Sequence, residues 1–325
     1  MELVDVKEKW ANRISTVTIG ATAAEGGTRG STVTVGGETT LPLLTFEGEI
    51  PHRPVIAGIV TDVVPDWPDV LKDAIGEVIN SPADWAKKCV EEFKVDLISL
   101  KLIGADPAGA KRSPAEAAET VKAVLEAVDV PLIFWGCGDE ETDSTVLPEC
   151  SQAARGENCL IGSATETNYR TLGAIGTADK HKVIAEAPVD INIGKQVNIL
   201  LQDAGFSLED TVMCQTTAAL GYGFDYVYTI FERVRIAGLK GDKLMALPQI
   251  ANVGWEVWKV KEAIQDDDIL PGWGKLAMRG PLWEATSATG YLQAGADILT
   301  LAHPQSIALV RNAIDEFMAN EGARE

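Results

Sequence analysis

The feature that most constrains the fold is a regular alternation between short apolar, β-branched runs and longer segments with helical spacing. Eight such runs follow one another along the chain: Val55–Asp62, Asp96–Leu102, Pro131–Gly138, Asn158–Thr165, Val183–Asp190, Asp210–Thr217, Leu247–Val253 and Asp297–His303. A strand followed by a helix, repeated over about 250 residues, predicts an α/β protein with a (β/α)8 TIM barrel. A doubly wound open sheet is the alternative, because an alternating sequence does not show whether the sheet closes.

Two of the segments between these runs carry clear helix-start signals. Ser81 and Ser113 are each followed by a proline and, three positions on, by an acidic residue. Such a serine can cap a helix, a proline is accepted in the first turn, and the acid favours the positive end of the helix dipole. We therefore expect helices to begin at these two serines.

Two segments lie outside the repeat. Residues 1–50 begin with an expected short helix over Lys7–Ile14, followed by two alternating runs, Ser15–Ala21 and Ser31–Gly36. The glycine-rich stretch between these runs predicts a β-hairpin. We expect an N-terminal helix and hairpin extension, which closes one end of the barrel or docks a partner, and a TIM barrel domain over residues 51–325.

The second such segment, residues 266–275, reads Asp-Asp-Asp-Ile-Leu-Pro-Gly-Trp-Gly-Lys and precedes an expected helix around Trp283 and Glu284. Its acidic triplet lacks the glycine and glutamate of an EF-hand calcium loop. A solvated loop is expected here.

Composition and charge exclude several classes of function. The chain carries 48 acidic residues against 28 lysines and arginines, a net charge of −20, which argues against nucleic acid and anionic membranes as partners. A neutral or cationic ligand, or a protein partner, fits this charge better. The chain has no stretch near the roughly 20 apolar residues of a membrane span and no apolar signal-peptide core, so we expect a cytoplasmic protein.

Cysteine and histidine positions give no sign of a metal centre. The five cysteines lack C-x-x-C spacing, which predicts reduced, mostly buried thiols and neither a disulfide framework nor an iron–sulfur or zinc cluster. They are Cys89, Cys137, Cys150, Cys159 and Cys214. The three histidines, His52, His181 and His303, are isolated in the sequence, so no catalytic metal site is predicted.

In a TIM barrel the functional residues gather at the carboxyl ends of the strands. Here those ends are rich in amides, hydroxyls and glycines and poor in catalytic groups. The sixth run contains no lysine for Schiff-base chemistry, and Lys101 at the end of the second run is expected to be a lone ion-pair partner. For Asp139 and Asp190, capping of the next helix and contact with a ligand fit equally well.

The stretch Cys214–Tyr226 sets Gly221 and Gly223 around Tyr222, directly after the sixth strand. Glycine allows positive φ and close approach of a large ligand to the backbone, while tyrosine offers a flat face and a hydroxyl. An ordinary loop turn is the alternative. Trp255, after the seventh strand, is a candidate for covering a flat ligand, and at least one of Trp255 and Trp258 is expected in the core.

Six stretches carry a resemblance to a known family. They are Ile-Gly-Ala-Thr-Ala-Ala-Glu-Gly-Gly-Thr-Arg (19–29), Phe-Glu-Gly-Glu-Ile-Pro (46–51), Val-Pro-Asp-Trp-Pro-Asp-Val-Leu-Lys-Asp (64–73), Leu-Gly-Tyr-Gly-Phe-Asp-Tyr (220–226), Gly-Asp-Lys (241–243) and Pro-Gly-Trp-Gly-Lys (271–275). Over nearly its whole length the chain resembles the small subunit of the corrinoid iron-sulfur protein, called the delta subunit of the acetyl-CoA decarbonylase/synthase complex in archaea.

The resemblance implies a barrel related to pterin-dependent methyltransferases that serves as a noncatalytic binding subunit. It implies a corrinoid (cobalamin) shared with a large subunit, which itself carries a four-iron four-sulfur cluster. The cobalt would accept a methyl group from a methyltetrahydrofolate or pterin methyltransferase. It would deliver that group to acetyl-CoA synthase/CO dehydrogenase in the reductive acetyl-CoA pathway. A reductive activator is a further implied partner.

A corrin ring is broad, flat and edged with carboxamides, so its receptor needs close backbone approach and many neutral hydrogen-bonding groups. No catalytic residue and no metal ligand is expected on this chain. The residues expected to face the corrinoid are Asn192, Thr216, Thr217, Gly221, Tyr222, Gly223, Asn252, Trp255 and Asp139.

The sequence departs from related patterns at two places. Cys214-Gln215 stands where the family has Asp-Pro, which removes a carboxylate role there and weakens a pterin-binding interpretation. His181 lies in a sequence like Asp-x-His-x-x-Gly, but Ile184 replaces the glycine, so ligation of cobalt is not expected. The alternative functions are a pterin-dependent methyltransferase that binds methyltetrahydrofolate in its own barrel, and an unrelated barrel enzyme.

Overall fold

The computed structural model, which describes residues 7–319, contains a closed barrel of parallel strands. In order around the barrel the strands are β10 (Ile298–Leu301), β3 (Val55–Thr61), β4 (Leu97–Lys101), β5 (Leu132–Trp135), β6 (Leu160–Ala164), β7 (Lys182–Ala187), β8 (Thr211–Gln215) and β9 (Gln249–Ala251). Ile298 pairs with Val55 on one side and with Ile250 on the other, which closes the sheet. Each predicted run coincides with one strand, although β7 begins one residue before its run, so the TIM barrel is confirmed and the open sheet is excluded.

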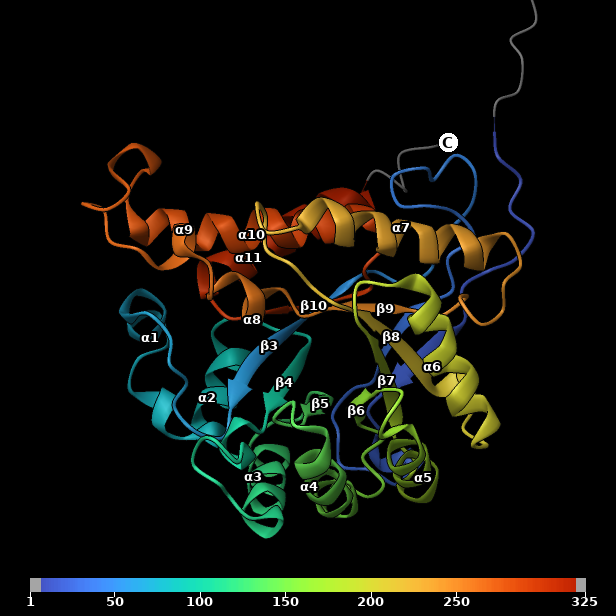
Figure 1. Cartoon of the computed structure of the whole chain (residues 1–325), viewed down its shortest axis with the longest axis horizontal. Coiled ribbons are helices and arrows are strands. Elements are labelled where there is room, and N and C mark those ends of the chain that lie inside the picture. Colours follow the sequence, from blue (N-terminus) through green and yellow to red (C-terminus); the bar gives the residue numbers. More distant parts are fainter. Residues whose placement is uncertain (1–6, 320–325) are drawn as a thin grey trace, which may run out of the picture.

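Helices surround the barrel (Figure 1). They are α1 (Asp69–Ile75), α2 (Pro82–Glu91), α3 (Pro114–Ala127), α4 (Glu140–Ala153), α5 (Tyr169–Asp179), α6 (Ile191–Asp203), α7 (Phe224–Leu239), α8 (Val253–Val257), α9 (Lys261–Ile264), α10 (Leu276–Ala294) and α11 (Pro304–Ala319). As predicted, Ser81 caps α2 and Ser113 caps α3, where Ser113 and Glu116 form a capping box. Within residues 7–319, no helix is both long and apolar enough to cross a membrane.

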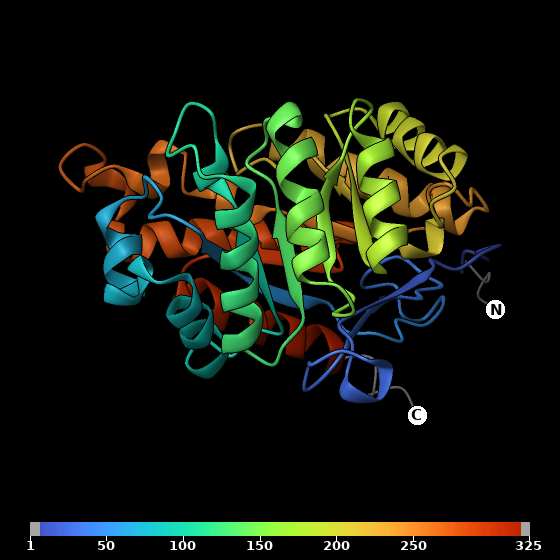
Figure 2. The ribbon, with the colours of Figure 1, turned by 90° about the horizontal axis from the view of Figure 1, so that it is seen from below.

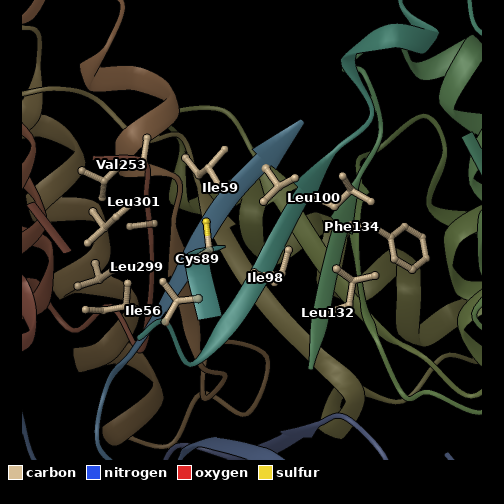
Figure 3. Packing of buried hydrophobic residues seen from close by; sticks show 14 of the residues in the cluster. Ile56, Ile59, Cys89, Ile98, Leu100, Leu132, Phe134, Val253, Leu299 and Leu301 are labelled. Carbon is tan, nitrogen blue, oxygen red and sulfur yellow. The ribbon is translucent and has the colours of Figure 1, made fainter. Parts of the chain in front are cut away.

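Alternate residues of each strand face opposite sides of the barrel wall. Ile56, Ile98 and Leu132 belong to the large core cluster between strands and helices, which also holds Cys89 of α2. Figure 3 shows Ile56, Ile98 and Leu132 on the neighbouring strands β3, β4 and β5. The other set of side chains, including Leu97, fills a second cluster inside the barrel. Both faces of the sheet are therefore buried, as a parallel sheet requires.

The N-terminal extension closes the amino end of the barrel. Strands β1 (Thr16–Ile19) and β2 (Val33–Gly36) pair antiparallel, which confirms the predicted hairpin. Val17, Ile19 and Val35 pack in one cluster with the interior residues of the barrel strands. Figure 2 shows the blue hairpin at one end of the barrel and the turquoise loop after β4 at the other.

The helix predicted over Lys7–Ile14 is wrong. This segment has no helical backbone, because its amides bind distant parts of the chain. The N–H groups of Ala11 and Asn12 donate to the carbonyl of Leu239 at the end of α7. Ile14 is fully buried against that helix end, so tertiary packing overrides the local helical spacing.

The cysteines and the acidic insertion match their predictions. All five cysteines are free thiols, of which Cys137 alone is not buried. The loop 266–275 is organised by Asp267, whose carboxylate accepts a hydrogen bond from the amide of Leu276 and pairs with Lys275 at 3.0 Å. The loop is thus a local turn that leads into α10, the helix predicted around Trp283.

Candidate functional site at the carboxyl end of the barrel

A groove of about 490 Å³ lies at the carboxyl end of the barrel. It runs between the loop after β8 and the segment formed by α8 and α9, and its volume lies in the range of small-ligand sites. The groove is lined by Val189, Thr216, Thr217, Ala218, Ala219, Tyr222, Gly223, Tyr226, Val227, Glu256, Lys259 and Val260. Four residues predicted to face a ligand, Thr216, Thr217, Tyr222 and Gly223, therefore meet in one groove.

Larger hollows lie elsewhere, including one of about 500 Å³ between the N-terminal segment and the loop after α6, and their linings explain why the smaller groove is the better candidate. One of about 870 Å³ is lined by charged residues of α2 and α3 with Arg29, and one of about 600 Å³ by residues near the amino ends of β6 and β7. In the 870 Å³ hollow, the Arg29 guanidinium is already bound by Glu157 and by backbone carbonyls. TIM barrels place their functional sites at the carboxyl ends of the strands, where the 490 Å³ groove lies.

The loop of residues 216–223, which we call the rim loop, is held by one face of α10. The Tyr291 hydroxyl donates to the carbonyl of Ala218 at 2.7 Å and accepts from its amide at 2.9 Å. The Ser287 hydroxyl accepts from the amide of Leu220, and the Trp283 indole donates to its carbonyl. Positions 283, 287 and 291 are four residues apart, so they share one helix face.

Beyond these anchors the rim loop is open. Gly221 and Gly223 have φ values of +83° and +92°, and apart from its chain neighbours no described residue has an atom within 4 Å of where a Cβ would project from either glycine. Both positions favour glycine through backbone conformation, and both leave room for close approach from outside. The Tyr222 hydroxyl donates to Glu262 at 2.7 Å, and this hydrogen bond raises the pKa of Tyr222. The residue as a whole is 46% exposed, so part of its surface remains available to a ligand.

The polar side chains that line the groove carry neutral hydroxyls, apart from two oppositely charged side chains that bind each other. Glu256 and Lys259 form an ion pair at 2.8 Å. The Thr216 hydroxyl donates to the carbonyl of Ala187, and the Thr217 hydroxyl accepts from the amide of Asn252. A groove with hydroxyls, a paired charge and several apolar side chains suits a neutral ligand with hydrogen-bonding edges.

Trp255 lies beside the groove without lining it. Its ring makes an edge contact with Trp67 at 5.9 Å between centroids, and two ammonium groups lie over it. The Nζ of Lys101 is 4.4 Å from the ring centroid and that of Lys259 is 5.6 Å away. Trp258 is 2% exposed, which confirms that one of the two tryptophans belongs to the core.

The expectation that Lys101 serves as an ion-pair partner is wrong. Among residues 7–319 its ammonium makes no ion pair within 4.0 Å, and the Trp255 ring is its contact. Burial lowers the pKa of Lys101, while the negative charge of Glu186 opposes this shift. Cation–π contact with an aromatic face compensates part of the lost hydration of the ammonium.

The remaining predicted residues are spread over the same end of the barrel. Asp139 caps α4 by accepting from the amide of Thr142, and Asn192 is exposed in the first turn of α6, which Asp190 caps. The Asn252 side chain accepts from the Thr300 hydroxyl, next to the groove residue Thr217. Asp139 and Asp190 thus both cap the helix that follows them, which was one of the two interpretations of these residues.

The structure also places the residues at which the sequence departs from related patterns. Cys214 faces the barrel interior and is buried, whereas Gln215 points outward toward Gly194 of α6. Both side-chain polar atoms of Gln215 are buried without a hydrogen-bond partner among the residues that the structure describes. His181 lies at the amino end of β7, where Nδ1 accepts from the amide of Cys159 and Nε2 contacts the carbonyl of Ser151. Both ring nitrogens of this histidine are therefore engaged inside the protein.

Sequence reasoning missed several lining residues, chiefly Val189, Tyr226, Glu256 and Lys259. Lys259 follows Trp255 by one helical turn, and Tyr226 closes the glycine-rich stretch, so both were accessible to spacing arguments. Among the described residues 7–319, no group of three or more His, Cys, Asp or Glu could hold a metal ion.

Comparison with solved structures defines the class of fold. The chain is similar to dihydropteroate synthase from Coxiella burnetii in complex with pteroic acid, with a TM-score of 0.57, 11% identity and coverage of 87% of this chain and 99% of that one. It is also similar to the Xanthomonas albilineans dihydropteroate synthase with 4-aminobenzoic acid, with a TM-score of 0.56, 14% identity and coverage of 84% and 95%. At such identities the likeness shows a shared TIM barrel.

Sequence comparison is more specific. Residues 16–310 match the family described as CO dehydrogenase/acetyl-CoA synthase delta subunit. The chain is 37% identical to the acetyl-CoA decarbonylase/synthase complex subunit delta of Methanosarcina mazei, over 93% of this chain and 70% of that protein. The Archaeoglobus fulgidus subunit delta is also 37% identical, over 95% and 69%. This chain belongs to the delta subunit family of the acetyl-CoA decarbonylase/synthase complex.

Proposed function

We propose that this chain is a noncatalytic subunit that holds a corrinoid, shared with a large partner subunit, at the carboxyl end of its barrel. When bound, the corrinoid supplies a cobalt atom that accepts a methyl group from a methyltetrahydropterin methyltransferase and passes it to acetyl-CoA synthase. The observation that carries the proposal is the open rim loop of a delta-family chain, beside a groove lined by neutral hydrogen-bonding groups.

The residues present fit such a group. Close approach of a broad, flat ring needs backbone without side chains, which Gly221 and Gly223 provide. Carboxamide edges need neutral donors and acceptors. The Thr216 and Tyr222 hydroxyls donate their protons within the protein and keep acceptor lone pairs, whereas the Thr217 hydroxyl accepts from Asn252 and has a proton to donate. In this role the chain binds and orients the cofactor and keeps water from one of its faces.

The rim loop can be tested with two matched glycine substitutions in a heterodimer with the large subunit. Gly223→Val places a branched side chain at φ +92° in the groove, and Gly205→Val does the same at φ +89° near the amino end of the barrel. Within the described part of the chain, neither new Cβ has an atom within 4 Å other than those of its chain neighbours, and the two φ values are similar, so both variants carry similar backbone strain. We expect Gly223→Val to lower the cobalamin retained after gel filtration by about tenfold or more.

Gly205→Val serves as the control and should retain cobalamin like the native chain. Equal retention by both variants in folded heterodimers would remove the rim loop from the binding site. Methyl transfer to added cobalamin by this chain alone, without any partner, would instead favour the pterin-dependent methyltransferase.

A further inference from the structure

Lys101 is a cation without an ion-pair or hydrogen-bond partner among residues 7–319. It ends β4 and faces the barrel mouth, where its ammonium makes no ion pair within 4.0 Å among residues 7–319 and contacts the ring of Trp255. An ammonium carries three hydrogen-bond donors, and a ring face satisfies none of them with a lone pair. A partly buried cation of this kind offers donors to a group that enters the mouth from outside.

Glu186 is the complementary group on the other side of the mouth. It lies on β7, where the Ser163 hydroxyl donates to one of its carboxylate oxygens. Among the described residues the other carboxylate oxygen receives no hydrogen bond from a side chain or the backbone. Glu186 is the negative charge that acts most strongly on Lys101, yet the two groups form no ion pair within 4.0 Å. A donor and an acceptor therefore face the same mouth without meeting.

The mouth adjoins the groove through Trp255. On the side of the mouth, the Nζ of Lys101 lies 4.4 Å from the Trp255 ring centroid. On the side of the groove, the Nζ of Lys259 lies 5.6 Å from the same centroid, and Lys259 lines the groove. The Trp255 ring therefore contacts one lysine of the groove and one of the mouth, so the groove and the mouth are neighbours.

We infer that Lys101 and Glu186 form a subsite for a primary carboxamide. A carboxamide presents a carbonyl acceptor to Lys101 and an NH₂ donor to Glu186 at the same time. A carboxylate would be repelled by Glu186, and a hydrocarbon would leave both groups without a partner. The inference rests on the proposed function, in which the carboxamide is one of those at the edge of the corrin ring.

The test measures cobalamin retention and the discrimination between cobalamin and its monocarboxylate derivatives, in which one carboxamide has been hydrolysed. Lys101→Met should lower retention of cobalamin in the heterodimer by about tenfold or more, since a hydrogen bond to a charged donor is lost. Glu186→Gln should raise the relative binding of one monocarboxylate derivative by about tenfold, because the repelling charge is gone. A purely structural role for either residue would not change this discrimination.

Lys182→Met is the matched control, since Lys182 starts β7 at the amino end of the barrel and pairs there with Asp210. It should retain cobalamin like the native heterodimer. Native retention and native discrimination in Lys101→Met and Glu186→Gln, together with loss in Gly223→Val, would overturn the subsite while the proposed function stands. A native heterodimer that retains no cobalamin would overturn both.

Discussion

At the scale of single residues, the most consequential contact is a buried ion cluster at the amino end of the barrel. Arg235 of α7 is fully buried and pairs with Glu38 at 2.5 Å and with Asp297 at 2.8 Å. Burial disfavours the guanidinium charge, but the two carboxylates overcome this effect and raise the pKa of Arg235. The cluster ties the N-terminal extension to the barrel, because Glu38 follows β2 and Asp297 precedes β10.

Replacing this arginine should be strongly destabilising. Arg235→Met leaves two buried carboxylates without a cation, which costs about 3–5 kcal/mol of unfolding free energy. Urea unfolding measures the loss. Arg53→Met removes an exposed ion pair to Asp315, whose side chains are 45% and 56% exposed, and should cost at most about 1 kcal/mol. Comparable losses in both variants would contradict the buried cluster.

A second residue-scale prediction concerns acid stability. His303 stacks on Trp258 with 5.8 Å between ring centroids, and burial lowers the pKa of His303 to about 4. The unfolded side chain titrates near pH 6.5, so between these values the unfolded state binds a proton that the folded state does not. This contribution is present above about pH 6.5 and is lost as the pH falls toward 4, by up to about 3 kcal/mol.

His303→Asn keeps an acceptor for the amide of Gln305, which now donates to Nδ1, but cannot be protonated. The unfolding free energy of this variant should therefore fall less between pH 7 and pH 4.5 than that of the native chain, by about 2–3 kcal/mol. An identical pH dependence in denaturant unfolding would show that His303 titrates normally in the folded state.

At the scale of elements, α10 is the support of the candidate site. Figure 1 shows this helix along one side of the barrel beside α7 and α11. Its face of Trp283, Ser287 and Tyr291 binds backbone atoms of Ala218 and Leu220 in the rim loop. The conformation of Gly221-Tyr222-Gly223 thus depends on a helix far along the chain.

Tyr291→Phe tests this support. The ring should keep its packing against Phe224 and Phe231, while both hydrogen bonds to Ala218 are lost. We expect a loss of about 1–3 kcal/mol in stability and faster amide hydrogen exchange at residues 217–223. Tyr228→Phe on α7, whose hydroxyl makes no hydrogen bond to the described residues, should change neither quantity. Unchanged exchange in Tyr291→Phe would show that the loop is held by other contacts.

The helices and strands also show how much of the fold could be predicted from the sequence alone. Buried parallel strands are continuous apolar runs, so the strands and their order were predictable. The Lys7–Ile14 segment was not, because its backbone donors bind Leu239, which is distant in sequence. The same reason applies to Lys101, whose partner is the Trp255 ring and not a nearby carboxylate. Strand-end reasoning located the groove, but only the fold showed that Asn192 and Asp139 lie outside its lining.

At the scale of the whole molecule, the two ends of the barrel have different roles. The amino end is closed by the hairpin, whose side chains pack among the interior residues of the strands, and by the Arg235 cluster. The carboxyl end carries the groove, exposed aromatic rings such as Tyr226 at 70%, and open glycines. Ligand binding is therefore expected at the carboxyl end, opposite the hairpin and the buried ion cluster.

The central claim is that a corrinoid is held jointly by this chain and a large partner subunit. The measurement that tests it most directly is the absorbance spectrum of three anaerobic samples with added cobalamin after gel filtration: the heterodimer, this chain alone and the partner alone. We predict a stoichiometric cobalamin spectrum for the heterodimer and little retained corrinoid for this chain alone. Full retention by the partner alone, unchanged when this chain is added, would contradict a shared site.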